Sequence, residues 1–189
     1  MSKYLDIATT SSVAAAQLRY GSAEQRARIS SRGGAEETPG SQRLGPAEAA
    51  FIRERDGFYL ASVSETGWPY VQYRGGPAGF LNALDPTLLG FADFRGNRQY
   101  ITTGNVAAND RVSLFLMDYA NRRRLKIFAH MRIIDAADDP SLAKRLTMPD
   151  YHARVERLVL LQVEAFDWNC PQHITPRYTL AELERWQSG

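Results

Sequence analysis

The sequence is poor in several residue types, and each shortage excludes a class of site. Among its 189 residues there is one cysteine, Cys170, which excludes an internal disulfide and a multi-cysteine metal site. The three histidines, at positions 130, 152 and 173, show no HxxxH spacing, so we expect no metal site. Lysine is also scarce, because 20 of the 23 basic residues are arginine.

Long apolar runs are absent as well. No stretch approaches the roughly 18 apolar residues of a membrane span, and residues 1–21 lack the continuous apolar segment of a signal peptide. With a single cysteine, this pattern predicts a protein of the reducing cytoplasm without a membrane partner. The content of 44% hydrophobic and 23% charged residues is usual for a globular domain with a core.

Net charge is small but unevenly distributed. The formal value of +2 is too low for a general nucleic-acid-binding surface, so we expect no nucleic-acid partner. Residues 71–132 hold nine basic and four acidic side chains, whereas residues 133–189 hold six basic and nine acidic ones. The middle of the chain is therefore where we expect a bound anion.

Hydrophobic patterning predicts a mainly β protein with flanking helices. Runs rich in β-branched, aromatic and aliphatic residues predict seven strands, at 58–64, 68–74, 80–84, 87–91, 112–117, 123–134 and 155–166. Helices are expected at 11–29, 46–55, 139–146 and from Thr179, where a capping-box pattern begins; residues 97–108 predict one or two helical turns. Since turns join most of the strands, an antiparallel barrel is the favoured architecture.

Two arginine-bearing stretches in the basic middle could bind an anion. In residues 91–99 a strand ends at a glycine-containing loop before a helix start, and backbone N–H groups with Arg95 and Arg98 suit a phosphate. A solvated loop with two surface arginines would have the same pattern. Residues 122–126 open a strand with three arginines and a lysine, which are either ligand donors or charges that protect an exposed edge strand.

Two further stretches combine aromatic and amide side chains. Residues 168–174 bring Trp, Asn, Gln and His together after a buried strand, which suits a planar heterocycle, or a turn whose tryptophan covers the barrel end. In residues 67–76, strand alternation puts Tyr70, Gln72 and Arg74 on one face. Gln72 and Arg74 suit ligand donors, whereas Trp68 and Tyr70 fit ligand contact or a core or dimer-interface position equally well.

The order of these stretches resembles the pyridoxamine 5'-phosphate oxidase-like, FMN-binding split-barrel family. The segments that carry the resemblance are DGFYLASVSETGWPYVQYRGGPAGF, LLGFADFRGNRQYITTGN, DRVSLFLMDYANRRRLKIFAHMRIID and VEAFDWNCPQHI. The resemblance implies a six-stranded split β-barrel that forms a homodimer with FMN in clefts between the subunits. The barrel domain would span residues 46–175, between an N-terminal helical and loop extension (1–45) and a C-terminal helix (176–189).

The resemblance also implies which residues contact the cofactor. Asn97, Arg98 and Gln99 match the family's phosphate clamp. Gln72, with Arg74 nearby, falls on a strand where the family often has a phosphate-binding arginine. Positions that match the strand end along the flavin are Phe91, Ala92 and Asp93. Arg123 or Arg124 matches a position whose side chain reaches the flavin from the partner strand. Trp168, Asn169 and His173 fall in the C-terminal region that completes the cleft.

Three departures from the family pattern limit what is implied. VQYRGG stands in place of the RxVLLK strand motif, Gln99 replaces the lysine of the clamp, and the C-terminal Arg-x-His element is not recognisable. The resemblance therefore implies FMN but no vitamin B6 substrate. Because the flavin itself carries the redox chemistry, we name no catalytic residue.

The function expected from the sequence is an FMN-dependent oxidoreductase, an oxidase or a reductase, acting on a small molecule. The first alternative is a carrier or sensor that holds flavin or haem without turnover, with His130 or His173 as the axial ligand in the haem version. A deazaflavin-dependent reductase is the second. A basic nucleic-acid-binding barrel is the third, and the small net charge argues against it.

Overall fold

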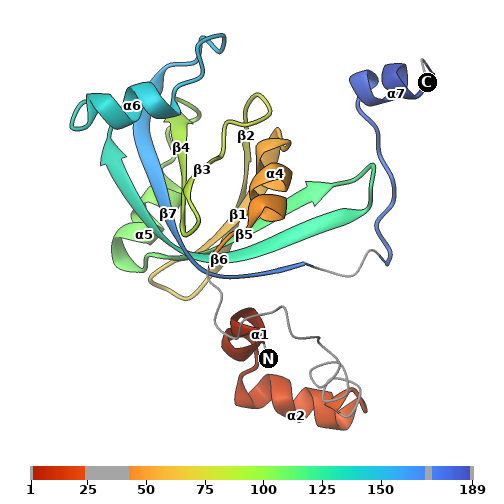
Figure 1. The fold of residues 1–189 in the computed structure, drawn as a ribbon. Helices are drawn as coiled ribbons and strands as arrows, with labels where there is room; N and C mark the ends of the chain where they lie inside the picture. Colours follow the sequence, from red (N-terminus) through yellow and green to blue (C-terminus); the bar gives the residue numbers. More distant parts are fainter. Residues whose placement is uncertain (1, 24–42, 169–171, 188–189) are drawn as a thin grey trace.

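The computed structural model describes residues 2–23, 43–168 and 172–187 (Figure 1). No helix in these ranges is long and apolar enough to cross a membrane. The helices are α1 (Lys3–Ala8), α2 (Ser11–Arg19), α4 (Pro46–Arg53), α5 (Ile101–Ala108), α6 (Pro140–Leu146) and α7 (Leu180–Gln187). The strands are β1 (Gly57–Val63), β2 (Pro69–Gly75), β3 (Asn82–Asp85), β4 (Leu88–Phe94), β5 (Arg111–Asp118), β6 (Arg123–Asp135) and β7 (Val155–Trp168).

All seven strands belong to one sheet, in the order β2-β1-β5-β6-β7-β4-β3, and every neighbouring pair is antiparallel. The long strands β6 and β7 curve through the middle, so that the sheet is strongly bent (Figure 1). Alternation along β6 buries Leu125, Ile127, Ala129 and Met131, as the sequence pattern predicts. The mainly β architecture with helices is therefore confirmed.

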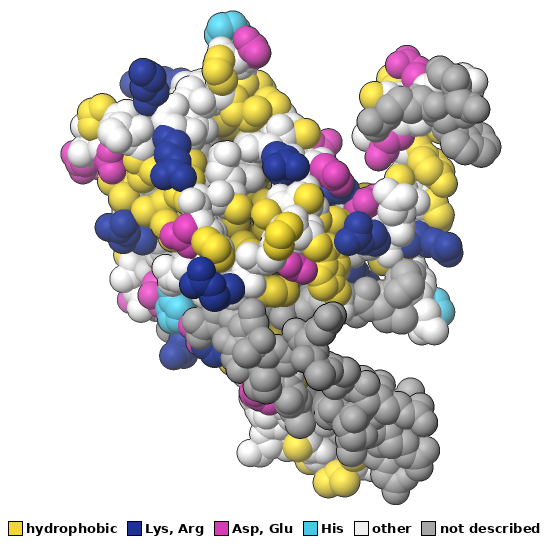
Figure 2. Space-filling view, in the orientation of Figure 1, with side chains coloured by type: hydrophobic (Ala, Val, Ile, Leu, Met, Phe, Trp, Pro, Cys, Tyr) yellow, Lys and Arg dark blue, Asp and Glu magenta, His cyan; other side chains and the backbone are white. Residues whose placement is uncertain are grey.

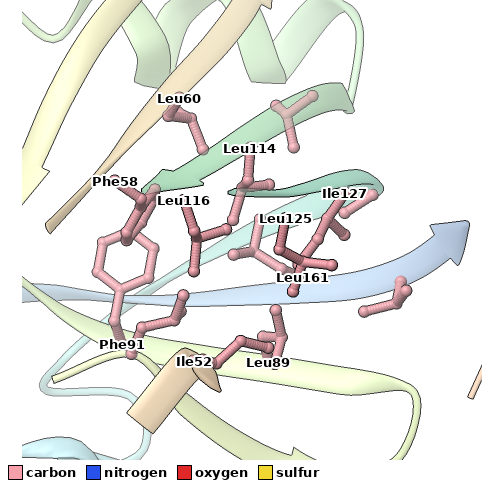
Figure 3. Close-up of a cluster of buried hydrophobic side chains, with 14 of the residues drawn as sticks. Ile52, Phe58, Leu60, Leu89, Phe91, Leu114, Leu116, Leu125, Ile127 and Leu161 are labelled. Atoms are coloured by element: carbon pink, nitrogen blue, oxygen red, sulfur yellow. The ribbon is translucent and has the colours of Figure 1, made fainter. Parts of the chain in front are cut away.

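The core fills the concave side of this sheet. Figure 3 shows side chains from β1, β4, β5, β6 and β7 pointing toward one another, with Ile52 of α4 among them. Three phenylalanines gather at one part of it, where the ring of Phe58 lies 5.7 Å from Phe80 and 5.6 Å from Phe91. Helix α4 begins with Pro46 at its first turn, and Glu48 accepts a hydrogen bond from the Gly45 backbone N–H at 2.8 Å.

The first helix packs on the outer side of the sheet, a contact that the sequence did not predict. The ring of Tyr4 in α1 stacks on Phe128 of β6 at 4.3 Å, and the Lys126 ammonium lies 4.6 Å from the same tyrosine ring. Lys3 pairs with Glu164 of β7 at 2.6 Å. Residues 2–8 are thus attached to the barrel by stacking and by charge.

An aromatic ring covers two glycines where β1 and β2 pair. Gly57 lies opposite Gly75, and the ring of Tyr73 lies across both residues. A Cβ atom at Gly75 would lie 2.8 Å from the tyrosine ring, and one at Gly57 would collide with it. Tyr73 nevertheless stays 57% exposed on its other side.

The observed elements differ from the prediction in a few places. The described residues form seven strands where the resemblance implies six; the short β3 follows two buried residues, Phe80 and Leu81, and begins later than predicted. The Asp85 carboxylate holds its turn by accepting hydrogen bonds from the N–H and hydroxyl of Thr87. Helix α2 ends at Arg19, and the predicted continuation over residues 24–29 lies outside the described ranges.

A buried carboxylate links strands that are far apart in the sheet. Asp93 of β4 is 3% exposed; one of its oxygens lies 2.6 Å from Arg74 of β2, and the other lies 2.7 Å from Arg157 of β7. In the sheet order β1, β5, β6 and β7 stand between β2 and β4. The Arg74–Asp93 pair therefore joins the two sides of the sheet across its open gap.

We predict that Asp93→Asn destabilises the fold by about 3 kcal/mol, because it leaves the largely buried Arg74 guanidinium without its counter-charge and Arg157 with Glu156 alone. The matched control is Asp110→Asn, since the side chain of Asp110 is 55% exposed and pairs with His130 on the surface. Its cost should stay below about 1 kcal/mol. Urea denaturation of both variants measures the free energy of unfolding. An equal decrease in the two variants would contradict a particular contribution of Asp93 to the stability of the fold.

Candidate functional site

A cavity of about 150 Å³ lies between β2, the loop before α5 and the start of that helix. We call it the loop pocket. Its polar lining from β2, β7 and the loop consists of Tyr70, Gln72, Arg74, Asn97, Arg98, Gln99, Tyr100 and Arg157. The first residues of α5, which are Ile101, Thr102 and Thr103, supply the rest of the lining together with Phe94 and Gly96.

The loop takes its shape from local hydrogen bonds and from two residues in the left-handed region. The side-chain oxygen of Asn97 accepts a hydrogen bond from the Gln99 backbone N–H at 3.1 Å. Arg98 and Tyr100 have φ angles of 59° and 53°, which non-glycine residues seldom adopt. This turn directs the chain into α5, whose first residues face the pocket.

Helix α5 is held against the barrel by two side-chain hydrogen bonds. The Asn105 amide donates to the Ser62 hydroxyl of β1 at 3.0 Å in a buried contact, and the Thr102 hydroxyl donates to the Gln72 carbonyl oxygen at 3.1 Å. In the part of the chain that the structure describes, the N-cap residue Tyr100 makes no side-chain hydrogen bond that caps the helix N-terminus. Its first N–H groups, at the positive end of the helix dipole, therefore remain available to an anion.

The charged groups around the loop pocket form one connected network. Arg157 donates to Asp93 through Nε at 3.0 Å and through Nη2 at 2.7 Å, and its Nη1 lies 3.3 Å from Glu156. Arg95 lies 3.6 Å from the other oxygen of Glu156. With Arg74 and Arg98, four arginines face two carboxylates, which leaves an excess of two positive charges.

Neighbouring groups favour the charged form of two of the three arginines that line the loop pocket. Burial works against the charge of Arg157, but Asp93, Tyr100 and Glu156 together outweigh it and raise the pKa of this arginine. The hydrogen bond to the Tyr100 hydroxyl likewise raises the pKa of Arg98. Arg74 adds an Nε atom that is buried without a hydrogen-bond partner among the described atoms. The donors thus exceed the acceptors that the described residues supply.

A second cavity of about 140 Å³ adjoins the first. We call it the aromatic pocket, and it shares Arg74 and Phe94 with the loop pocket. The rest of its lining is Tyr73, Gly75, Phe80, Phe91, Ala92 and Asp93. The Arg74–Asp93 ion pair lies where a polar, anion-attracting space meets a largely aromatic one.

The structure brings together eight of the residues that the sequence nominated. Gln72, Arg74, Asn97, Arg98 and Gln99 line the loop pocket, and Phe91, Ala92 and Asp93 line the aromatic pocket. The side chains of Phe91 and Ala92 are mostly buried in the core, so they shape the wall more than they face the space.

The other nominated residues lie elsewhere in the chain. The guanidinium of Arg123 lies 4.6 Å from the ring of Trp168 and 5.2 Å from that of Phe51, and the Trp168 indole N–H donates to Glu48 at 2.7 Å. Arg124 lies against Phe115 of β5.

Strand pairing explains this separation. The residue next to these arginines, Leu125, pairs with Trp168 at the end of β7, whereas Arg157 stands near its start. The eleven steps between Arg157 and Trp168 span about 35 Å of extended strand. His173 is exposed at a φ of 60°, and Asn169 lies outside the described residues.

Neither of the histidines considered as haem ligands lines these two cavities. His130 lies on the outer face of β6, with Nδ1 3.0 Å from Asp110 and Nε2 3.9 Å from Glu164. Within the described ranges, no three His, Cys, Asp or Glu side chains gather in a way that could hold a metal ion.

Sequence reasoning missed Arg157, Glu156 and Tyr100. Arg157 lies near the start of a long, largely apolar strand, and Asp93 lies in a buried strand. A charged side chain inside an apolar run is stable only when an opposite charge pairs with it. That signal could have suggested their pairing. The role of Tyr100 depends on its left-handed backbone, for which the sequence offers no such signal.

Solved structures share this fold at low sequence identity. The HupZ protein of Group A Streptococcus is 11% identical with a TM-score of 0.52, over 71% of this chain and 99% of that one. A Lactobacillus delbrueckii structure named for pyridoxamine 5'-phosphate oxidase is 20% identical with a TM-score of 0.51, over 67% of this chain and 94% of that one. Among curated proteins, none matches this chain.

The family comparison covers the barrel and both pockets. The model described as pyridoxamine 5'-phosphate oxidase matches residues 44–169, which run from just before α4 to just after β7. Its match spans the paired strands, the loop pocket and the aromatic pocket. The chain therefore belongs to the pyridoxamine 5'-phosphate oxidase family, a family of flavin-binding oxidoreductases.

Proposed function

We propose that this protein binds FMN and acts as an FMN-dependent oxidoreductase on a small molecule. The observation that carries the proposal is the loop pocket, where arginines in excess of carboxylates meet an uncapped helix N-terminus. A phosphate monoester carries close to two negative charges at neutral pH, which matches the excess of two positive charges. Membership of a flavin-binding family supports the same ligand.

In this proposal the loop pocket holds the phosphate. Arg98 supplies a charge-assisted donor, and the first N–H groups of α5 add neutral donors along the helix dipole. Gln72, whose carbonyl oxygen is engaged by Thr102, presents its amide group from the β2 side. Gln99 stands where the family has a lysine, so the helix and Arg98 take a larger share of the binding here.

The aromatic pocket receives the flavin ring in the same proposal. Its phenylalanines exclude water, and the Arg74–Asp93 pair offers both a donor and an acceptor to the polar edge of a heterocycle. Arg74 is well placed for this role because its buried Nε has no partner among the described atoms. When bound, the flavin supplies the hydride or electron transfer.

We further propose that the protein works as a homodimer in the cytoplasm. An exposed apolar face runs over β1 and β2, where Tyr59 pairs with Tyr73 and Ala61 with Val71, which is 60% exposed. A second copy on this face could also bring Arg123 and Trp168 toward the first copy's pockets, which they do not line within one chain.

On the face in Figure 2, Lys and Arg side chains of the described residues stand mostly singly between hydrophobic and acidic ones.

The first test is the visible absorption spectrum of the purified protein, with release of any chromophore by denaturation. We expect a flavin spectrum and FMN as the released compound. Anaerobic addition of NADH or NADPH then separates a reductase from a carrier, since hydride transfer from the nicotinamide to the flavin bleaches the flavin spectrum. A Soret band would favour haem instead, and a colourless protein that ignores added FMN would contradict the proposal.

Arg98→Ala should weaken FMN binding by about tenfold or more, because it removes a charge-assisted hydrogen bond to the phosphate. Fluorescence titration of the apoprotein with FMN measures the dissociation constant. Arg132→Ala is the control, since Arg132 is exposed on β6 and lines neither pocket. An unchanged FMN affinity in Arg98→Ala would contradict the assignment of the loop pocket as the phosphate site.

Val71→Asp should convert a dimer into monomers, because it places a charge in the middle of the exposed β1–β2 face. Light scattering after size exclusion should report about twice the 21.2 kDa chain mass for the wild type and that mass for the variant. Leu18→Asp, on α2 and away from this face, should leave the mass unchanged. A wild-type monomer that holds FMN in full would contradict the homodimer.

A further inference from the structure

We infer that Tyr100 is a positioning residue that holds the Arg98 guanidinium at the loop pocket before an anion arrives. The inference rests on the proposed function of this pocket as the phosphate site. It concerns a residue that sequence reasoning did not nominate.

The hydroxyl of Tyr100 lies between two charged partners. It accepts a hydrogen bond from Nε of Arg98 at 3.3 Å and donates one to Oε2 of Glu156 at 3.4 Å. The face of its ring carries the Arg157 guanidinium at 4.7 Å. The hydroxyl and the ring of Tyr100 are therefore both held in place, by Glu156 and Arg157, which belong to the Asp93 network.

Within the described ranges, the Arg98 side chain makes no hydrogen bond or ion pair besides its bond to Tyr100. Its side chain is exposed, and its long rotamer-rich stem follows a left-handed backbone position in the loop. An exposed arginine loses conformational freedom when it binds, and this loss weakens affinity. A hydroxyl that already restrains the guanidinium removes part of that loss before binding.

The geometry separates the ring of Tyr100 from its hydroxyl. The ring covers Arg157 and closes the pocket wall, whereas the hydroxyl reaches Arg98 and Glu156. Tyr100→Phe keeps the first contact and removes the second. This substitution therefore tests positioning without emptying the wall.

The experiment is a double-mutant cycle on FMN binding by the apoprotein. Tyr100→Phe should raise the FMN dissociation constant about fivefold in the wild-type background and change it by less than about twofold when Arg98 is already alanine. Riboflavin, which lacks the phosphate, should bind Tyr100→Phe as it binds the wild type. Tyr178→Phe, on an exposed segment outside both pockets, is the matched control.

A ligand-free readout accompanies the cycle. In the ¹⁵N arginine Nε spectrum of the apoprotein, the signal that Arg98→Ala removes should shift in Tyr100→Phe and stay in place in Tyr178→Phe. A merely structural role for Tyr100 would weaken riboflavin and FMN alike and would persist in the Arg98→Ala background. Either result, or an unchanged FMN affinity in Tyr100→Phe, overturns the inference.

FMN binding by the wild type distinguishes a failure of the Tyr100 inference from a failure of the proposed function. If the wild type binds FMN and Tyr100→Phe binds it equally well, positioning by Tyr100 fails and the proposed function stands. If the wild type does not bind FMN, the proposed function fails, and a titration with inorganic phosphate followed through the Arg98 signal decides the inference. A signal that does not move with phosphate overturns it as well.

Discussion

Asp93 is a carboxylate that the hydrophobic core would exclude if it stood alone. Burial of one ionised group is costly, and the cost is met here by two arginines that approach from strands on either side of the sheet opening. The same contacts bring β2 close to β4, form the wall between the two pockets and connect through Arg157 to Tyr100 and the loop. The position of the proposed cofactor site therefore depends on how this one charge is satisfied.

Much of the barrel follows from local patterns in the sequence. Alternation along residues 123–134 identifies the buried face of β6, and the Thr179 capping box marks the start of α7, where Thr179 and Glu182 exchange hydrogen bonds. These features depend on neighbours within a few residues. The seven strand segments were recognisable for the same reason, whereas their order in the sheet depends on pairings between distant segments.

The site was predictable only where one stretch of chain supplies it. The loop from Asn97 to Gln99 carries its own turn, so its residues could be nominated together. Arg157 lies more than fifty residues further along the chain, and only the antiparallel pairing of β4 with β7 brings it to Asp93. Trp168 was nominated for the cleft from its neighbours in sequence, but within one chain its indole is already bonded to Glu48.

The tyrosine that lies over the Gly57–Gly75 pair links three positions that are not neighbours in sequence. A methyl group at either glycine would need the space that the ring of Tyr73 fills, so alanine at position 57 or 75 would require that ring to move. Because the same ring lines the aromatic pocket, its displacement would change one wall of that space. The glycine pair therefore helps to set the shape of the pocket, although only Gly75 of the two lines it.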